Sequence, residues 1–301
     1  MHQHTGTLSP TPPFDLAQTL AFLTGFPPLR GEQTIAPAAL TKAIMVNGQP
    51  LGFQITAAGT IEEPRVNYTL SAGEALDAAT IAAAEDRLTF FLGLDDDLRP
   101  FYAIGRADPA FAPVIEQLYG YHQIKFPTPF ENACWAILTQ RTPMAVAARQ
   151  KTALTARYGG SVNVAGTEYA AFPDAAALAN ANPDELTAIV GTTRRTNYLL
   201  SAAEAFTAVD EQWLRTAPWA EVERWLLRIK GIGAWSASFV LIRGLGRMAV
   251  LPSGEGQHNE IVSRLYLAGK PATAAEVARI AAPYGEWQGY WAHYLPGHLS
   301  R

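Results

Sequence analysis

Two glycines one residue apart stand in the segment RIKGIGAWSASFVLIRGLGRMAVLPSGE, residues 228–255. Gly231 and Gly233 permit positive φ and close backbone approach, so the chain can reverse tightly between two helices there. The second helix is expected to begin near Ser236, and the amides from Gly233 through Ala234 to Ser236 would face outward from its N-terminus. Such amides bind one phosphate without a basic side chain. A plain turn between packed helices explains the glycines at least as well.

Cysteine chemistry is nearly absent from the chain. The single cysteine, Cys134, excludes an internal disulfide framework and a four-cysteine iron–sulfur cluster or zinc site. Its place in an apolar segment favours packing within a helix.

The first 14 residues lack the basic and apolar regions of a secretory signal, and they are predicted to be a loose lead-in. No apolar run is long enough for a membrane helix. A chain with one cysteine suits a reducing cytoplasm, so we expect a cytoplasmic protein.

Charge is distributed unevenly along the 301 residues, which suffice for two compact units. The net charge of −4 is unfavourable for a nucleic-acid-binding protein. Residues 1–98, however, carry 4 basic and 11 acidic side chains, whereas residues 99–301 carry 19 basic and 16 acidic ones. The pattern suggests an acidic unit that faces away from a polyanion and a mildly basic unit that could face it.

The elements that position the glycine pair fall into two groups. Residues 15–26 are typical of a short helix, residues 42–59 and 62–73 alternate as antiparallel strands around turns, and residues 78–94 form a helix. After the acidic segment DDDLRP at 95–100 the strand pattern ends, and helical periodicity recurs. We therefore predict an α+β protein, with a small antiparallel β-rich domain over 1–98 and an all-α domain over 99–301.

The longer pattern around the glycines resembles a known motif. Leu226, Ile229, Gly231, Gly233 and Trp235 together resemble a helix–hairpin–helix. The match extends over roughly 110–295 and includes the segments YHQIKFPTPFENACWAILTQRTP and YGEWQGYWAHYL. The chain thus resembles the helix-hairpin-helix superfamily of base-excision DNA glycosylases, and within it the DNA-3-methyladenine glycosylase II (AlkA) type. The resemblance implies an enzyme that extrudes a damaged base from the duplex and hydrolyses its N-glycosidic bond.

The resemblance also assigns a carboxylate. In the family a catalytic Asp lies in the turn that follows the hairpin helix, and here that turn, LPSGEGQHNEIV, contains no Asp. Glu255 stands at the matching place when the turn is counted from Pro252, and its extra methylene gives ~1.5 Å more reach. A carboxylate there would stabilise the positive charge that develops on the sugar and would orient water. Glu260 is the second candidate.

Aromatic residues match the family's base pocket. Trp235 stands where bifunctional relatives carry a nucleophilic lysine, and a tryptophan cannot form a Schiff base. The resemblance therefore implies a monofunctional enzyme that leaves an abasic site. Trp235, Phe239 one helical turn further on, and Tyr290 are predicted to line the pocket. A pocket tryptophan of the family is replaced near Pro296.

Other family contacts map onto loops of this chain. Gln140 and Arg141 match the loop that enters the minor groove, where arginine could fill the gap left by the extruded nucleotide. By the same match, the backbone carbonyls of Leu227, Ile229 and Ile232 would bind a structural monovalent cation. No other cofactor is expected.

The expected partner is nucleoid-associated, double-stranded DNA with damaged, alkylated bases, bound by a monomer. Two alternatives remain open on the residues alone. The protein could bind damaged DNA without catalysis, having lost the family's Asp, or it could be a helical module that contacts protein. Only the last predicts no salt-dependent affinity for DNA.

Overall fold

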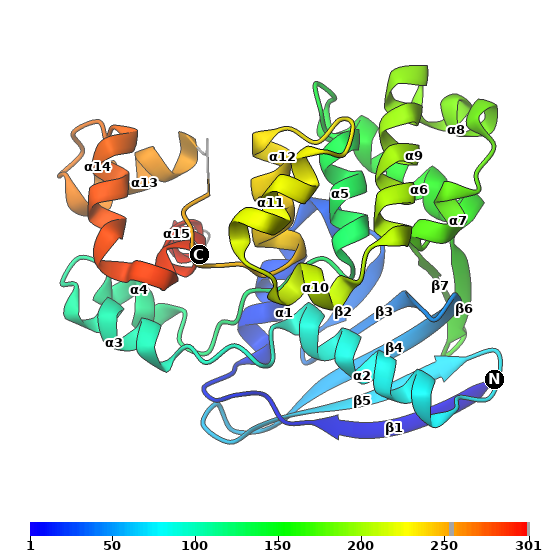
Figure 1. The fold of residues 1–301 in the computed structure, drawn as a ribbon. Helices are drawn as coiled ribbons and strands as arrows, with labels where there is room; N and C mark the ends of the chain where they lie inside the picture. Colours follow the sequence, from blue (N-terminus) through cyan, green and yellow to red (C-terminus); the bar gives the residue numbers. More distant parts are fainter. Residues whose placement is uncertain (253–255, 300–301) are drawn as a thin grey trace.

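A computed structural model of the chain describes residues 1–252 and 256–299. An antiparallel sheet in the order β1-β5-β4-β3-β2 lies at one end, and helices make up most of the remainder (Figure 1). The predicted α+β architecture is confirmed. The elements up to residue 98 are β1 (His2–Leu8), α1 (Leu16–Gly25), the 3-10 turn η1 (Pro27–Leu29), β2 (Gln33–Ala36), β3 (Ala39–Val46), β4 (Gln49–Gly59), β5 (Pro64–Ala72) and α2 (Ala78–Leu92).

The central hairpin of the sheet follows directly from its turn residues. Asn47 and Gly48 both have positive φ, 50° and 76°, which is the conformation that an Asn-Gly hairpin turn requires. Phe53 and Ile55 on β4, together with Leu70 on β5, are fully buried in the main core. Alternation along the strands therefore places one face of the sheet against the interior.

The prediction of a loose lead-in over residues 1–14 is wrong. His2–Leu8 forms β1, which pairs antiparallel with β5 along its whole length. A Cβ on Gly6 would lie 2.2 Å from the hydroxyl of Tyr68 on β5, so a glycine permits the close approach of the two strands. Because β1 is an exposed edge strand with few apolar residues, its pairing depends on β5 and not on its own hydrophobic pattern.

The prediction that residues 99–301 contain no strand is also wrong. A hairpin of β6 (Gly160–Val164) and β7 (Thr167–Ala171) packs on β3 and β4. Val162 and Val164 are buried against Ala43, and a Cβ on Gly52 would lie 2.3 Å from Val164. Each strand has five residues, of which few are apolar, so the alternation is too short to be recognised in the sequence.

Apart from this hairpin, the second part of the chain is helical. The predicted boundary at 95–100 falls between α2 and the next helix, and the largest core cluster contains residues from both sides of it. The further helices are α3 (Arg99–Ala107), α4 (Ala112–Gln117), α5 (Pro129–Leu138), α6 (Met144–Tyr158), α7 (Ala175–Ala179), α8 (Pro183–Val190), α9 (Thr193–Ala208), α10 (Glu211–Thr216), α11 (Trp219–Leu227), α12 (Ala234–Phe239), the π-helical turn η2 (Val240–Gly244), α13 (Gly256–Tyr266), α14 (Ala274–Ala281), the 3-10 segment η3 (Ala282–Trp287) and α15 (Gln288–Leu299).

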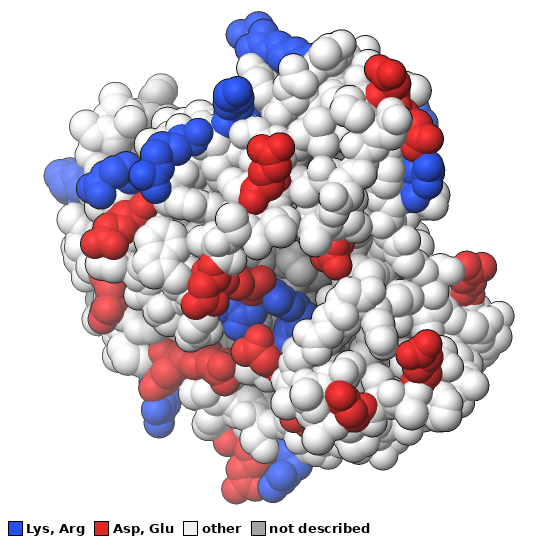
Figure 2. Space-filling view, turned by 45° about the vertical axis from the view of Figure 1, so that its right-hand side comes forward, with Lys and Arg blue, Asp and Glu red and all other residues white. Residues whose placement is uncertain are grey.

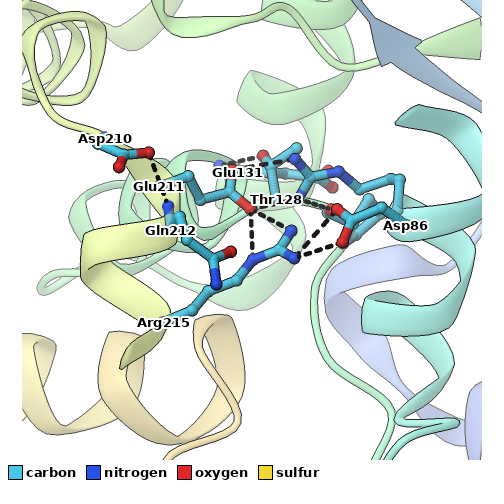
Figure 3. Close-up of polar contacts among 9 residues, drawn as sticks. Asp86, Thr128, Glu131, Asp210, Glu211, Gln212 and Arg215 are labelled. Atoms are coloured by element: carbon cyan, nitrogen blue, oxygen red, sulfur yellow. Dashed lines mark hydrogen bonds and ion pairs between the residues drawn. The ribbon is translucent and has the colours of Figure 1, made fainter. Parts of the chain in front are cut away.

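Ion pairs connect α2 to the helical part (Figure 3). Arg87 donates to both carboxylate oxygens of Glu211 on α10, at 2.7 and 3.0 Å. Arg215, also on α10, pairs with Glu211 and with Asp86, and its guanidinium lies 3.9 Å from the centre of the Phe90 ring. These contacts fix the acidic N-terminal part in place relative to the helices. Within the described residues, no helix has the length and apolar composition that a membrane crossing requires.

A second, buried network joins Glu32, which precedes β2, and strand β3 to α5 and α6. Lys151 on α6 is 2% exposed and pairs with Glu32 and Glu131, and Lys42 on β3 also pairs with Glu32 at 2.9 Å. Burial alone would raise the pKa of Glu32, but the charges of Lys42 and Lys151 outweigh it and lower the pKa from 4.5 to about 2. Glu32 therefore stabilises the fold only while it is ionised.

Acid should weaken the fold through this glutamate. Since its pKa is depressed on folding, its contribution is complete above pH 4.5 and is lost as the pH falls toward about 2. The loss should amount to no more than ~3 kcal/mol. Glu32→Gln should therefore flatten the decline of the free energy of unfolding between pH 5 and 2, measured with urea, whereas exposed Glu63→Gln should not. Parallel declines in the two variants would contradict this role.

Candidate functional site

The glycine pair forms a hairpin between α11 and α12. Gly231 has φ +88°, and a Cβ there would lie 2.3 Å from Cγ of Tyr198, so both conformation and space require glycine. Gly233 is the N-cap of α12, with an ordinary φ of −95° and no atom within 4 Å of where its Cβ would be. The helix begins at Ala234, two residues earlier than predicted. Its first amides thus lie behind an open space on the surface.

Side chains at this helix start differ in exposure. Gly233 and Ala234 are exposed, whereas Ser236 is 4% exposed. At Ser236, therefore, the backbone amide and not the buried side chain is the candidate for a phosphate contact. The predicted phosphate site would consist of main-chain donors alone, which suits a chain without excess positive charge.

The loop after α5 is attached to this hairpin. Gln140 donates from Nε2 to the carbonyl oxygen of Gly231 at 2.6 Å. Arg141, the next residue, is exposed and has φ +50°, a conformation that is uncommon for a residue other than glycine. The structure thus brings both residues of the predicted wedge loop beside the hairpin, with the arginine at the tip.

A pocket of about 570 Å³ opens next to the hairpin helix. Trp235 and Phe239 form part of its wall, and their rings are stacked, with centroids 5.2 Å apart and planes 8° apart. Trp235 is 45% exposed, and among the described residues it is the one aromatic side chain in the group of exposed large apolar residues. Two of the three predicted pocket aromatics are therefore adjacent and accessible. A flat aromatic surface of this kind can stack against a purine or attract a cationic ring.

Other walls of the pocket come from distant parts of the chain. Phe22 on α1 and Phe26, the residue that follows α1, contribute from the N-terminal part, and His293 and Pro296 contribute from α15. Pro296 thus lies in the pocket wall, in the region where the family tryptophan is replaced. No pattern in the sequence identified Phe22 and Phe26 as pocket residues, because they are separated from α12 by more than 200 positions.

One cationic side chain belongs to this wall. The guanidinium of Arg243 lies 4.9 Å from the ring centres of both Phe22 and Phe26, and it contacts Nδ1 of His293 at 3.1 Å. Burial, with the neighbouring charge of Arg243, holds the pKa of His293 well below its usual range. The imidazole is therefore neutral at neutral pH, and its Nδ1 accepts the hydrogen bond from arginine.

The third predicted aromatic does not line the pocket. Tyr290 is 2% exposed, lies in the second core cluster and donates its hydroxyl to Asp96. The wall residues of α15 are Gly289, Ala292, His293 and Pro296, a helical stripe on which Tyr290 has no place. Assigning Tyr290 to the base pocket is therefore wrong on geometry.

The two candidate carboxylates after Pro252 are Glu255 and Glu260. Glu255 lies outside the described residues. Pro252 and His258, which stand on either side of it in the sequence, both line the pocket. Glu260 is exposed, forms an ion pair with Arg264 one helical turn away and is not part of the wall. The second candidate for catalysis thus faces away from the pocket.

The cation site predicted on the backbone carbonyls of Leu227, Ile229 and Ile232 stays a prediction. Leu227 ends α11, and the Ile232 amide donates to the Ile229 carbonyl at 3.1 Å within the turn. Carbonyl oxygens at a helix end and a tight turn are suitable ligands for Na⁺ or K⁺ in chemistry and position. Among the described residues, no group of three His, Cys, Asp or Glu side chains forms a metal site.

A two-glycine hairpin between helices, a loop attached to it and an aromatic pocket beside it define the helix-hairpin-helix class of base-excision glycosylases. A family model described as "HhH-GPD superfamily base excision DNA repair protein" matches residues 134–284. The chain belongs to this family, and it is a DNA N-glycosylase of base excision repair.

Particular relatives agree with this assignment. A DNA-3-methyladenine glycosylase of Bacillus subtilis is 30% identical over 204 residues, 67% of each chain. A probable bifunctional transcriptional activator/DNA repair enzyme AlkA of Mycobacterium tuberculosis is 25% identical over 221 residues, 73% of this chain and 43% of that protein. In fold, the chain is similar to a 3-methyladenine DNA glycosylase from Archaeoglobus fulgidus, with a TM-score of 0.76, 21% identity and 96% of each chain covered.

Proposed function

We propose that the protein is a monofunctional glycosylase that releases alkylated bases from duplex DNA and acts as a monomer. The observation that carries the proposal is the stacked pair of Trp235 and Phe239 in a pocket next to the hairpin. An extruded base needs an enclosed site with an aromatic surface. N-alkylated purines carry a positive charge, and an aromatic face attracts a cationic ring. The names of the Bacillus and Archaeoglobus relatives support the same class of lesion.

The hairpin and the wedge loop would hold the DNA in position. Amides from Gly233 to Ser236 would bind one backbone phosphate, and a monovalent cation on the carbonyls of Leu227, Ile229 and Ile232 would add positive charge beside it. Arg141, at the tip of its loop, would fill the gap in the duplex. Backbone contacts of this kind position the strand, and the pocket selects the base.

Glu255 would carry the chemistry. The turn that contains it connects two residues of the pocket wall, Pro252 and His258. Its carboxylate would stabilise the oxocarbenium-like sugar in the transition state and orient the attacking water. A cationic alkylated purine leaves without strong help from a general acid, so a single carboxylate is sufficient.

Strand cleavage is not expected. Trp235 stands at the hairpin position where a lyase would need an amine, and Lys230 is not part of the pocket wall. Borohydride should therefore trap less than ~1% of the enzyme as a covalent complex on abasic or lesion DNA, because no Schiff base forms. The measurement is a denaturing gel of labelled duplex after reduction. Efficient trapping would show that another amine carries out lyase chemistry.

The decisive experiment is base release from methylated duplex DNA, followed by a separate assay for strand breaks without alkali. Release of free base with intact strands supports the proposal. Salt-dependent binding of damaged duplex without any release would instead support a damage-binding protein that lost the family's Asp. Membership of the enzyme family favours catalysis.

A further inference from the structure

A second recess lies beside the hairpin, on the surface of α9. This α9 groove has a volume of about 700 Å³ and shares no wall residue with the base pocket. Its lining combines cationic, hydroxyl and amide side chains with one carboxylate. The residues are Arg194, Asn197, Tyr198, Leu200, Ser201, Glu204 and Lys230.

The groove is continuous with the hairpin turn. Gly231 packs directly on the ring of Tyr198, where any Cβ would collide. The adjacent Lys230 is attached to α9 through its backbone amide, which donates to Oγ of Ser201 at 3.3 Å. The lysine side chain is exposed, and it forms no ion pair among the described residues. The turn that is proposed to hold one phosphate therefore positions a cation at the rim of the groove.

Arg194 supplies the second cation and is held in place by the same tyrosine. Its Nε donates to the hydroxyl of Tyr198 at 2.7 Å, and its guanidinium lies 5.4 Å from the centre of that ring. The two terminal nitrogens donate to no group of the described protein. Two contacts to one partly buried ring restrict the side chain, so less rotamer freedom is lost when it binds a ligand.

The chemistry of this lining favours a phosphate. Arginine and lysine next to the Ser201 hydroxyl provide several donors, and guanidinium and ammonium groups are the usual partners of phosphate oxygens. The carboxylate of Glu204 repels an anion, so it lowers the affinity of the groove for phosphate. On the face drawn in Figure 2, acidic and basic side chains are interspersed and form no broad basic surface. A local site such as the groove is therefore a natural source of affinity for a polyanion on a surface of this kind.

We propose that the α9 groove binds a second backbone phosphate of the DNA, on the strand held by the hairpin, through Arg194 and Lys230. The inference rests on the proposed function, since it assumes that DNA lies against the hairpin. It assigns to α9 a part in DNA binding that is separate from the wedge loop and from the base pocket.

The test is the salt dependence of DNA affinity. Each lost phosphate contact lowers the slope of log K against log salt by ~0.9, so the double variant Arg194→Gln/Lys230→Gln, which removes the one phosphate contact of the groove, should lower it by ~0.9. Binding of undamaged duplex and of duplex with an abasic-site analogue should weaken alike. The matched control is Lys270→Gln/Arg279→Gln, which removes the same charge near α14, far from α9 in Figure 1. The control should leave the slope close to that of the wild type.

A change of opposite sign completes the experiment. Glu204→Gln removes the carboxylate of the groove and should strengthen duplex binding by roughly 2–5-fold at low salt. Single-turnover base release with saturating enzyme should persist in all these variants, because none of the residues lines the pocket. A wild-type slope in the double variant, or an equal loss of slope in the control, would overturn the proposal that the groove binds phosphate. The proposal for the hairpin would remain. Wild-type protein without salt-dependent binding would instead refute the proposed function.

Discussion

Glu255→Gln should retain the fold and bind lesion DNA, but it should release base at least ~100-fold more slowly than the wild type, the scale for losing one electrostatic partner of a transition state. Glutamine preserves the size and the hydrogen-bonding oxygen of the side chain while removing its charge. The loss should therefore appear in the single-turnover rate and not in the affinity. The measurement is release of methylated base from duplex DNA under saturating enzyme.

Glu255→Asp distinguishes a site that has adapted to glutamate from a site that lost its activity when glutamate replaced the family's Asp. The family's acid is restored, but the carboxylate is withdrawn by ~1.5 Å, and small displacements of a catalytic group can cost ~100-fold in rate. If the backbone has adapted to glutamate, Asp should be slower than the wild type. If activity was lost through this substitution, Asp should create base release where the wild type shows none.

Glu260→Gln is the matched control for both variants. Glu260 lies on the first turns of α13, is exposed and pairs with Arg264, so removing its charge should leave base release within about twofold of the wild type, as is usual for surface ion pairs. Equal rates for the wild type and Glu255→Gln would remove Glu255 from the mechanism. The damage-binding alternative would then be the better account.

The longer pattern around the glycines was sufficient to predict the hairpin, and the spacing of Trp235 and Phe239 was sufficient to place both at the pocket. Gly231 permits the turn because its φ of +88° favours glycine, and this condition is local, whereas its close approach to Tyr198 appears only in the fold. Trp235 and Phe239 are four positions apart on one helix, so they face the same way wherever the helix packs. The sequence contains this information in a few adjacent positions.

Tertiary packing determined what could not be predicted. Phe22 and Phe26 enter the pocket only because the tertiary fold brings α1 and its C-terminal end to the same pocket as α12, which no local pattern encodes. In α15, aromatic residues occur on several faces, and the sequence alone does not show which face is turned to the pocket. The helix turns its smaller stripe there, Gly289, Ala292, His293 and Pro296, and buries Tyr290 in the core. Whether an aromatic residue lines the pocket thus depends on which face of its helix is turned to the pocket, and an aromatic residue in a matching segment does not by itself show this.

Gly233→Val should fold and yet lose affinity for DNA by at least ~10-fold at physiological salt, for damaged and undamaged duplex alike. The φ of −95° suits any residue, and no atom lies within 4 Å of the new Cβ, so the variant meets no internal clash. A poorer N-cap should cost only ~1 kcal/mol of stability. The side chain would instead occupy the open space in front of the amides of α12, which a phosphate must enter.

Two further glycines make this prediction specific. Gly73→Val has equally open surroundings in the N-terminal part and should change neither stability nor binding. Gly231→Val combines φ +88° with a Cβ 2.3 Å from Tyr198, so it should lower the thermal midpoint as well as the affinity. Binding isotherms for both duplexes, with melting curves for each variant, distinguish the three cases. Because a backbone phosphate site does not distinguish one base from another, a loss confined to damaged DNA in Gly233→Val would place the hairpin at the lesion and not on the phosphate.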